Sequence, residues 1–333
     1  MKIAINGFGR IGRSVFRILE KRDDIDVVAI NDLFDHNALA YLLRYDTVMG
    51  RLPGGAKIED DMMITKNSKV KMFSERDPKQ LPWGDLGIDV VVEATGVFRK
   101  REQIQMHLTA GAKRVILTVP SKDEIDNTIV IGVNENELKA SDLIVSNASC
   151  TTNCLAPMAK ILNDNFGIKE GVMTTTHAYT NDQRLADVPH SDWRRSRAAA
   201  ENIIPTTTGA ARAVGKVLPV LNGKLDGLAA RVPVPDGSVV DLVCELEKDV
   251  TIEDINAAVK AACQTDRMKN IVQYSENHLV SSDIIGNPFS SIYDASFTRV
   301  VGKRIVRTLN WYDNEWGYSN RVVDLMGLIR DLD

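Results

Sequence analysis

Residues 2–12 read KIAINGFGRIG, a short apolar run that leads directly into Gly7-Phe8-Gly9-Arg10-Ile11-Gly12. The run over Lys2–Asn6 predicts a buried strand, and the apolar spacing after it predicts a helix from about Arg10 to Lys21. Glycines at such a junction permit a tight turn, the close approach of a pyrophosphate and close helix–strand packing, while the helix N-terminus attracts the anion. We therefore expect a dinucleotide-binding unit here, with Gly7, Gly9 and Gly12 at the phosphates.

Asp32 supports this interpretation and indicates which dinucleotide is bound. It follows the next predicted strand, Val27–Asn31, and stands 20 residues after Gly12. A carboxylate at this place accepts hydrogen bonds from a ribose diol and repels a 2′-phosphate. We expect the cofactor to be NAD rather than NADP. The structural alternative is a plain glycine turn followed by a helix-capping aspartate.

The alternation of strands and helices continues to about residue 150, which predicts an α/β fold with a Rossmann-type parallel sheet. Further elements are expected at Ala38–Tyr45 (a helix), Val90–Ala94, Arg114–Thr118, Thr128–Gly132 and Leu143–Val145. From about Gly171, longer β-rich runs predict an α+β catalytic domain with a mostly antiparallel sheet. The runs are Val172–Tyr179, Gly227–Val234, Val239–Glu247, Ser291–Thr298 and Arg304–Tyr312, with helices near Gly209–Val217 and Ile252–Gln264.

Two domains are also the expectation from length, because 333 residues exceed a typical single domain. We predict an NAD-binding domain over residues 1–149 and a catalytic domain over residues 150–313. Residues 314–333 carry Val322, Leu325, Met326 and Ile329 at helical spacing. This pattern predicts a C-terminal helix, which we expect to pack back on the first domain.

Charge and composition exclude several classes of partner. The 41 Lys and Arg residues against 45 Asp and Glu give a net charge of −4, so no basic field indicates nucleic acid or a membrane surface. The N-terminal residues do not resemble a signal peptide, and no apolar run reaches the ~20 residues that span a bilayer. Four cysteines are too few for a disulfide scaffold. We expect a cytoplasmic protein that binds small molecules and copies of itself.

Cys150 is the candidate nucleophile. It lies in Ser146-Asn147-Ala148-Ser149-Cys150-Thr151-Thr152-Asn153-Cys154, between a predicted strand and an apolar-periodic stretch. This places Cys150 in the first turn of a helix, where the dipole and free N–H groups favour a thiolate. We interpret Cys154, Cys244 and Cys263 as packing residues. No second Cys/His cluster completes a zinc site, so no metal is expected.

His177, at the end of the strand Val172–Thr176, is the candidate base. An imidazole beside the sulfur would stabilise an ion pair at rest and then accept a proton as the reaction proceeds. The chain contains five histidines, and we interpret the other four, His36, His107, His190 and His278, as structural residues.

Together these segments resemble phosphorylating glyceraldehyde-3-phosphate dehydrogenase. The resemblance rests on Gly7–Arg13, Asn31-Asp32, Ser146–Cys154 and His177-Ala178-Tyr179-Thr180-Asn181-Asp182. It continues through Arg195, Asn202–Ala210, Arg231-Val232-Pro233 and Trp311-Tyr312-Asp313-Asn314-Glu315, and so covers essentially the whole chain. Ser191-Asp192-Trp193 departs from the commoner pattern, in a segment that borders subunits in that family.

The resemblance implies a homotetramer that converts glyceraldehyde 3-phosphate and inorganic phosphate into 1,3-bisphosphoglycerate through a hemithioacetal and a thioester on Cys150, assisted by His177. It assigns the substrate phosphate to Thr180 and Arg231, the attacking phosphate to Ser149, Thr151, Thr208 and Gly209, and the region between them to Arg195. It assigns cofactor contacts to Arg10, Ile11, Asp32, Arg76, Thr118 and Asn314. Pro189 matches the NAD-using members and agrees with Asp32. Arg194 and Arg197 are interpreted as a solvated face.

Three alternatives stay open at this point. Erythrose-4-phosphate dehydrogenase shares the cysteine segment and the glycine turn, but its members usually differ just after the histidine. A catalytically idle binding protein on the same fold is a second alternative, although Cys150, His177 and Arg231 are all present. The third is a thiol-redox switch that uses Cys150 and Cys154.

Overall fold

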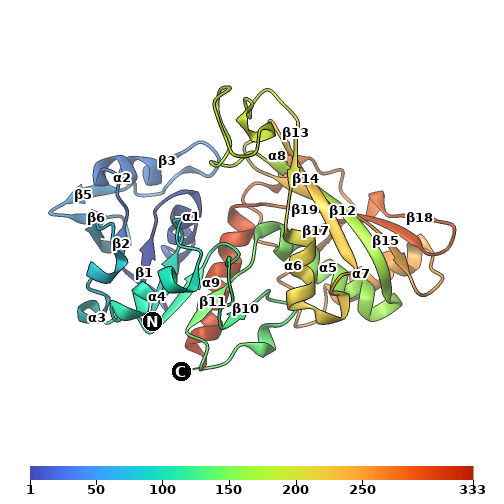
Figure 1. Ribbon diagram of the computed structural model, residues 1–333, viewed down its shortest axis with the longest axis horizontal. Helices are drawn as coiled ribbons and strands as arrows, with labels where there is room; N and C mark the ends of the chain where they lie inside the picture. The colour runs from blue at the N-terminus through green and yellow to red at the C-terminus, as the bar shows by residue number, and fades with distance from the viewer. Residues whose placement is uncertain (333) are drawn as a thin grey trace. The chain divides into compact units, whose positions relative to one another are not determined.

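The computed structural model describes residues 1–332, and the chain divides into two compact units (Figure 1). Unit 1 comprises Met1–Ile129, Asn136–Ala148 and the residues from Ser319 onward. Unit 2 comprises Val130–Glu135 and Ser149–Tyr318. Among residues 1–332, no helix combines the length and the apolar character needed to cross a membrane.

Unit 1 is built on a mostly parallel sheet, which confirms the Rossmann-type sheet predicted from the sequence. Its strands lie in the order β10 (Asn127–Thr128), β11 (Ile144–Ser146), β9 (Arg114–Leu117), β8 (Val90–Glu93), β1 (Lys2–Asn6), β2 (Asp26–Asn31), β7 (Lys69–Phe73), β6 (Met62–Ile64) and β5 (Lys57–Glu59). All neighbouring strands in this order from β10 through β7 are parallel. The last two pairs, β7 with β6 and β6 with β5, are antiparallel. Every residue of β8 and β9 is buried, as expected for strands covered on both faces.

The helices of unit 1 pack apolar side chains onto this sheet. They are α1 (Arg10–Leu19), α2 (His36–Arg44), α3 (Trp83–Leu86), α4 (Arg101–Thr109) and most of α9 (Trp316–Arg330). Trp83 and Ile104 are fully buried in one core cluster with Val91 and Val115 of the sheet. In α9, the four apolar residues that predicted the helix are at most 1% exposed, and Arg330 near its end pairs with Asp24.

Unit 2 contains a mostly antiparallel sheet, as predicted. The strand order is β13 (Ile204–Thr207), β14 (Leu225–Val232), β12 (Ile168–Ala178), β15 (Ser238–Leu246), β19 (Ile305–Tyr312), β17 (Ser291–Asp294) and β16 (Val272–Ser275), with β18 (Arg299–Val301) on β19. The helices are α5 (Cys150–Phe166), α6 (Ala210–Val217), α7 (Ile252–Ala262) and the short α8 (Ser281–Ile284). Helix α5 is buried along most of its length and packs on β12, β15, β17 and β19 (Figure 1). Strands β12 and β14 are parallel neighbours, so their carboxyl ends meet at one edge.

Local predictions differ from the structure in several places. The strand predicted over Ser291–Thr298 ends at Asp294, because the Asp294 side chain accepts from Ser296 N–H (3.2 Å) and begins a 3-10 turn over Ala295–Phe297. The strand predicted over Thr128–Gly132 ends at Thr128, because the chain turns there: Val130 N–H donates to the Asn134 side chain (2.9 Å), and Gly132 has a φ of +90°. The sequence pattern also does not predict β5 and β6, since strands of three residues are too short to show a period.

Candidate active site

Cys150 is the first residue of α5, as the sequence predicted, and Ser149 caps the helix. The Ser149 hydroxyl accepts a hydrogen bond from Thr152 N–H (3.1 Å) and lies 2.7 Å from the Thr152 hydroxyl. The cap satisfies one of the free N–H groups of the first turn, and the others remain directed at the end where the thiol lies. Negative charge on the sulfur is therefore favoured by the helix dipole.

His177, near the end of β12, brings its Nε2 to 3.5 Å from the Cys150 Sγ. The imidazole is almost fully buried, and the Tyr312 ring packs edge-on against it with 5.9 Å between centroids. The Tyr312 hydroxyl lies 2.9 Å from the Thr151 hydroxyl and 2.8 Å from that of Thr175. Tyr312 thus links α5 to β12 and fixes the two elements that carry the thiol and the imidazole.

Arg231 lies beside His177 because the parallel register of β12 and β14 places the two residues opposite each other. The Arg231 Nη1 is 2.7 Å from His177 Nδ1 and 3.0 Å from the Ala178 carbonyl oxygen. The same carbonyl oxygen is 2.7 Å from His177 Nδ1. Because arginine only donates, a bond from Arg231 makes Nδ1 an acceptor and puts the ring proton on Nε2. A bond from Nδ1–H to Ala178 instead leaves Nε2 free to accept the thiol proton.

The electrostatics of the pair differ from the resting ion pair expected from the sequence. Burial raises the pKa of the Cys150 thiol, and the charge of Arg231 and the hydrogen bond from Thr151 only partly oppose this effect. Burial, followed by repulsion from Arg231, lowers the pKa of His177 to about 3. Both shifts favour the uncharged thiol and uncharged imidazole, because neither charge is well solvated in this pocket.

The residues assigned to anion binding group around this pair within unit 2. Thr180 donates to Asp182, whose other carboxylate oxygen accepts from Arg195 (2.5 Å). Arg195 also donates through Nε to the Thr206 hydroxyl (3.0 Å). Both Asp182 and Arg195 act electrostatically on His177, so they lie within its surroundings. The guanidinium groups of Arg195 and Arg231 are therefore both available to bind anions near His177.

Thr208 and Gly209 precede α6, and the beginning of α6 contacts the first turn of α5. The Thr208 hydroxyl accepts from Ala210 N–H (3.2 Å), and Thr152 donates to the Ala210 carbonyl oxygen (3.5 Å). Two helix N-termini thus meet close to Cys150, and each one attracts anions. Thr151 differs from the expectation in one respect, because its hydroxyl is directed at Tyr312.

In unit 1, the glycine turn has the geometry that its sequence predicts. Gly7 has a φ of +92°, and a Cβ there would lie 2.6 Å from Thr95 N, while a Cβ on Gly12 would lie 2.2 Å from the Gly7 carbonyl oxygen. Around Gly9, by contrast, a Cβ would meet nothing within 4 Å. Open space over the N-terminus of α1 suits a pyrophosphate, so these residues fit an NAD cofactor.

The other predicted cofactor residues of unit 1 line the carboxyl ends of its strands. One carboxylate oxygen of Asp32 accepts from Phe8 N–H (2.7 Å), which ties this residue to the glycine turn. The Thr118 hydroxyl donates to the Glu93 carbonyl oxygen (3.0 Å), and the Arg10 guanidinium pairs with Asp46 (2.5 Å). Ile11 lies in the first turn of α1, and Arg76 is exposed.

Asn314 lies in unit 2, where its side chain has a defined orientation. Its Oδ1 accepts from the Ser238 hydroxyl (2.6 Å), which in turn accepts from Ala178 N–H (3.0 Å). The preceding residue, Asp313, is buried and accepts from three backbone N–H groups, including those of Glu315 and Trp316.

Asp236 is a second buried carboxyl group in this region. Burial, followed by the charge of Asp313, raises its pKa to about 9. We therefore expect Asp236 to hold a proton at neutral pH, when Asp313 is the charged member of the pair.

Three residues that support the sites, Tyr312, Ser238 and Glu93, are not predicted from the sequence. Tyr312 and Glu93 lie within apolar strand patterns. The only sequence signal for a special role is a polar group, a hydroxyl or a carboxyl, at a position expected to be buried. Within residues 1–332, no group of three or more His, Cys, Asp or Glu side chains is arranged to hold a metal ion.

Family models and curated relatives match this chain over nearly its whole length. Residues 1–101 match the family model "Glyceraldehyde 3-phosphate dehydrogenase, NAD binding domain", and residues 149–314 match the model of its C-terminal domain. The chain is 56% identical over 330 residues to the glyceraldehyde-3-phosphate dehydrogenase of Geobacillus stearothermophilus, covering 99% of this chain and 98% of the relative. It is 55% identical over 327 residues to that of Streptomyces coelicolor, covering 98% and 97%. The chain belongs to the glyceraldehyde 3-phosphate dehydrogenase family.

Proposed function

We propose that this protein oxidises glyceraldehyde 3-phosphate with NAD and inorganic phosphate to give 1,3-bisphosphoglycerate. The observation that carries the proposal is the Cys150 thiol at the start of α5, 3.5 Å from His177 Nε2. A nucleophile in hydrogen-bond reach of a base, with anion-binding residues around it, suits covalent catalysis on a phosphorylated aldehyde.

In the first step, the Cys150 sulfur attacks the aldehyde carbon and its proton passes to His177 Nε2. Acceptance of the proton requires the tautomer in which Nδ1–H donates to the Ala178 carbonyl oxygen. Arg231 favours the other tautomer while it contacts Nδ1, so its engagement by the substrate phosphate supports the base form of Nε2. His177 then returns this proton to the former carbonyl oxygen, so the product of this step is a neutral hemithioacetal on Cys150 and His177 is again able to accept a proton.

Bound NAD would supply the hydride acceptor, and loss of a hydride from the hemithioacetal carbon gives a thioester. His177 then carries the proton released from the hydroxyl group. Inorganic phosphate attacks the thioester carbon, the carbon–sulfur bond breaks, and the acyl phosphate leaves. The Cys150 sulfur takes back the proton from His177, which restores the starting pair. We assign the substrate phosphate to Thr180 and Arg231, and the attacking phosphate to the α5 and α6 N-termini. The latter subsite comprises Ser149, Thr151, Thr208 and Gly209, with Arg195 between the two subsites.

For the cofactor, we propose contacts from Gly7, Gly9, Gly12, Asp32 and Asn314, together with Arg10, Ile11, Arg76 and Thr118. We also propose that residues 1–149 form the NAD-binding domain with the helix of residues 314–333, and that residues 150–313 form the catalytic domain. The carboxylate of Asp32 supports NAD over NADP, because it repels a 2′-phosphate.

We further propose a homotetramer, located in the cytoplasm. Large apolar side chains are exposed along one segment of unit 2: Leu185 is 85% exposed, Trp193 87% and Ile203 71%. Exposure of this kind marks surfaces that associate, and a second copy of the chain is the partner we propose. Sedimentation equilibrium should give about four times the 36.8 kDa chain mass, and a monomer would contradict the proposal.

The test of the function is the formation of NADH with glyceraldehyde 3-phosphate, with and without inorganic phosphate. We expect turnover to require phosphate, and Cys150→Ser to abolish it. Full turnover in Cys150→Ser would refute the mechanism. A preference for erythrose 4-phosphate at equal concentration would identify the sister activity, and a folded wild-type protein without turnover would favour a binding role.

A further inference from the structure

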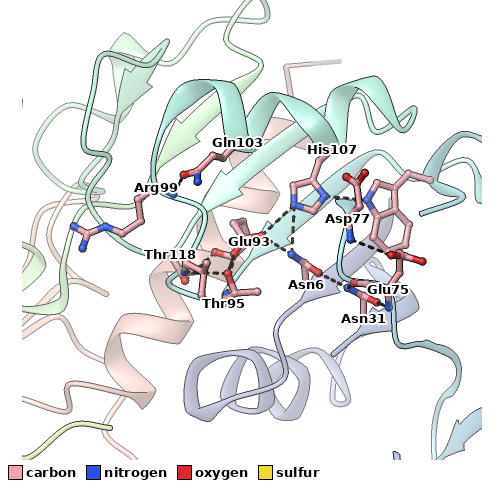
Figure 2. A network of polar contacts seen from close by, with 12 residues as sticks. Asn6, Asn31, Glu75, Asp77, Glu93, Thr95, Arg99, Gln103, His107 and Thr118 are labelled. Carbon is pink, nitrogen blue, oxygen red and sulfur yellow. Dashed lines mark hydrogen bonds and ion pairs between the residues drawn. The ribbon is translucent and has the colours of Figure 1, made fainter. Parts of the chain in front are cut away.

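Glu93, the last residue of β8, is a carboxyl group with no exposed surface in a strand that is otherwise valine. Four donors surround it (Figure 2). Asn6 Nδ2 (2.6 Å) and His107 Nε2 (3.0 Å) face Oε2, while the Thr95 backbone N–H (2.9 Å) and the Thr95 hydroxyl face Oε1. A buried carboxylate is tolerated only when donors replace its hydration, and here both oxygens have two.

The orientation of the Asn6 donor is fixed from one side of the network. Asn31 binds the backbone of Glu75 twice, accepting from its N–H (2.8 Å) and donating to its carbonyl oxygen (2.9 Å). The same Asn31 Nδ2 donates to Asn6 Oδ1 (2.7 Å), so the Asn6 amide must direct its NH₂ group at Glu93 (Figure 2).

The orientation of the His107 donor is fixed from the other side. Trp83 Nε1–H, which can only donate, contacts His107 Nδ1 (3.1 Å). Nδ1 is therefore the acceptor, and the ring proton lies on Nε2, directed at Glu93. Asn6 and His107 therefore both donate to the Glu93 side chain, as does Thr95. Only a carboxylate can accept from all of these donors.

This carboxylate is connected directly to the glycine turn. Asn6 precedes Gly7, whose N–H donates to the Asn31 carbonyl oxygen (2.8 Å). The backbone of Thr95 forms the surface on which the turn packs, because a Cβ on Gly7 would lie 2.6 Å from Thr95 N. Glu93 therefore holds both the residue that leads into the turn and the residue beneath it.

We propose that Glu93 is a positioning residue for NAD: its buried carboxylate fixes the turn that receives the pyrophosphate, without touching the cofactor. The inference rests on the proposed assignment of the pyrophosphate to Gly7–Gly12. In a Glu93→Gln variant of unchanged shape, the amide must present N–H to Asn6 and His107 or to the Thr95 N–H. The turn then shifts to relieve the contact between donors.

The experiment compares wild type, Glu93→Gln, Glu93→Asp and the matched control Glu102→Gln, which changes an exposed glutamate of α4. For Glu93→Gln, we expect the Kd and KM for NAD to rise about 10-fold or more, with kcat at saturating NAD changed less than about threefold. The rate of Cys150 alkylation by iodoacetamide should not change. Glu93→Asp keeps the charge and should retain part of the affinity, and Glu102→Gln should match wild type.

A folded Glu93→Gln variant with wild-type affinity for NAD would overturn the inference, as would a parallel fall of kcat, alkylation rate and NAD affinity. If Glu93→Gln does not fold, Asn6→Ala and Thr95→Ala each remove one donor side chain, and unchanged NAD affinity in both would overturn it equally. Failure of the wild-type protein to bind NAD would refute the proposed function instead.

Discussion

The contact between Arg231 and His177 leads to a quantitative expectation for the imidazole. The guanidinium Nη1 lies 2.7 Å from His177 Nδ1, and its charge is a named cause of the low pKa of His177, second to burial. At about 4 Å between charge centres and an effective dielectric constant of about 20, the repulsion is about 4 kcal/mol, equivalent to about 3 pKa units. Arg231 is partly exposed, so solvent reduces the expected effect to about 2 units.

We therefore expect Arg231→Gln to raise the pKa of His177, which is about 3 in wild type, by this amount in the protein without substrate. NMR of protein labelled at histidine Cε1, with His177→Asn to assign the signal, measures this directly. In wild type, the His177 signal should not move between pH 5 and 8, whereas in Arg231→Gln it should already shift within this range as the pH falls toward 5. Arg307→Gln, which removes an arginine paired with Asp241 elsewhere in unit 2, is the matched control.

A His177 signal in Arg231→Gln that stays as insensitive to pH as in wild type would refute this effect of Arg231, as would an equal shift in Arg307→Gln. We also expect Arg231→Gln to lower kcat/KM for glyceraldehyde 3-phosphate, because the same guanidinium is assigned to the substrate phosphate. Removal of a charged hydrogen bond of this kind costs about 1.5–3 kcal/mol, or roughly 10- to 150-fold.

Three other expectations follow from packing and burial. Gly12→Ala should lower both Tm and NAD affinity, because its Cβ would lie 2.2 Å from the Gly7 carbonyl oxygen. Gly9→Ala has open space around its Cβ, so it should keep the wild-type Tm and weaken only NAD binding. Equal Tm values for the two variants would contradict this expectation. Cys154→Ser should keep turnover, since burial raises the Cys154 pKa and the thiol hydrogen-bonds to Ser291 and Asn310. A loss matching Cys150→Ser would favour the redox switch. Asp236, with its folded-state pKa raised to about 9, retains a proton that the unfolded chain releases, so the folded state loses stability as the pH rises from about 4 to 9. Asp236→Asn should remove this loss and be more stable than wild type at pH 8, by at most about 6 kcal/mol in urea unfolding. An unchanged pH profile of stability would contradict the assignment.

The parts predicted from sequence are those that depend on local chemistry. The glycine turn, Asp32 at a strand end and Cys150 at a helix start are all encoded by neighbouring residues, and the structure has each element where the pattern predicts it. Contacts between distant segments leave no such pattern. Tyr312 touches Thr151 across 161 residues, and Glu93 meets Asn6 across 87.

The charge state of Cys150 and His177 also depends on contacts that the sequence does not reveal. Residue types alone predicted a resting ion pair, because cysteine beside histidine usually forms one. The structure adds the depth of the pocket and the guanidinium of Arg231, and both act against charge on His177. Neither the burial of His177 nor its distance from Arg231 can be predicted before the tertiary packing is known.

The alignment of His177 with Arg231 across β12 and β14 has a consequence for how this chain tolerates change. The two residues are separated by 54 positions along the chain, yet their proximity depends on the backbone ladder between two strands. Insertions in the intervening loops can accumulate while the pair keeps its spacing. Deletion of one residue within Leu225–Ala230 would turn Arg231 to the opposite face of the sheet, so length variation among descendants of this chain should avoid that strand and concentrate in the loops.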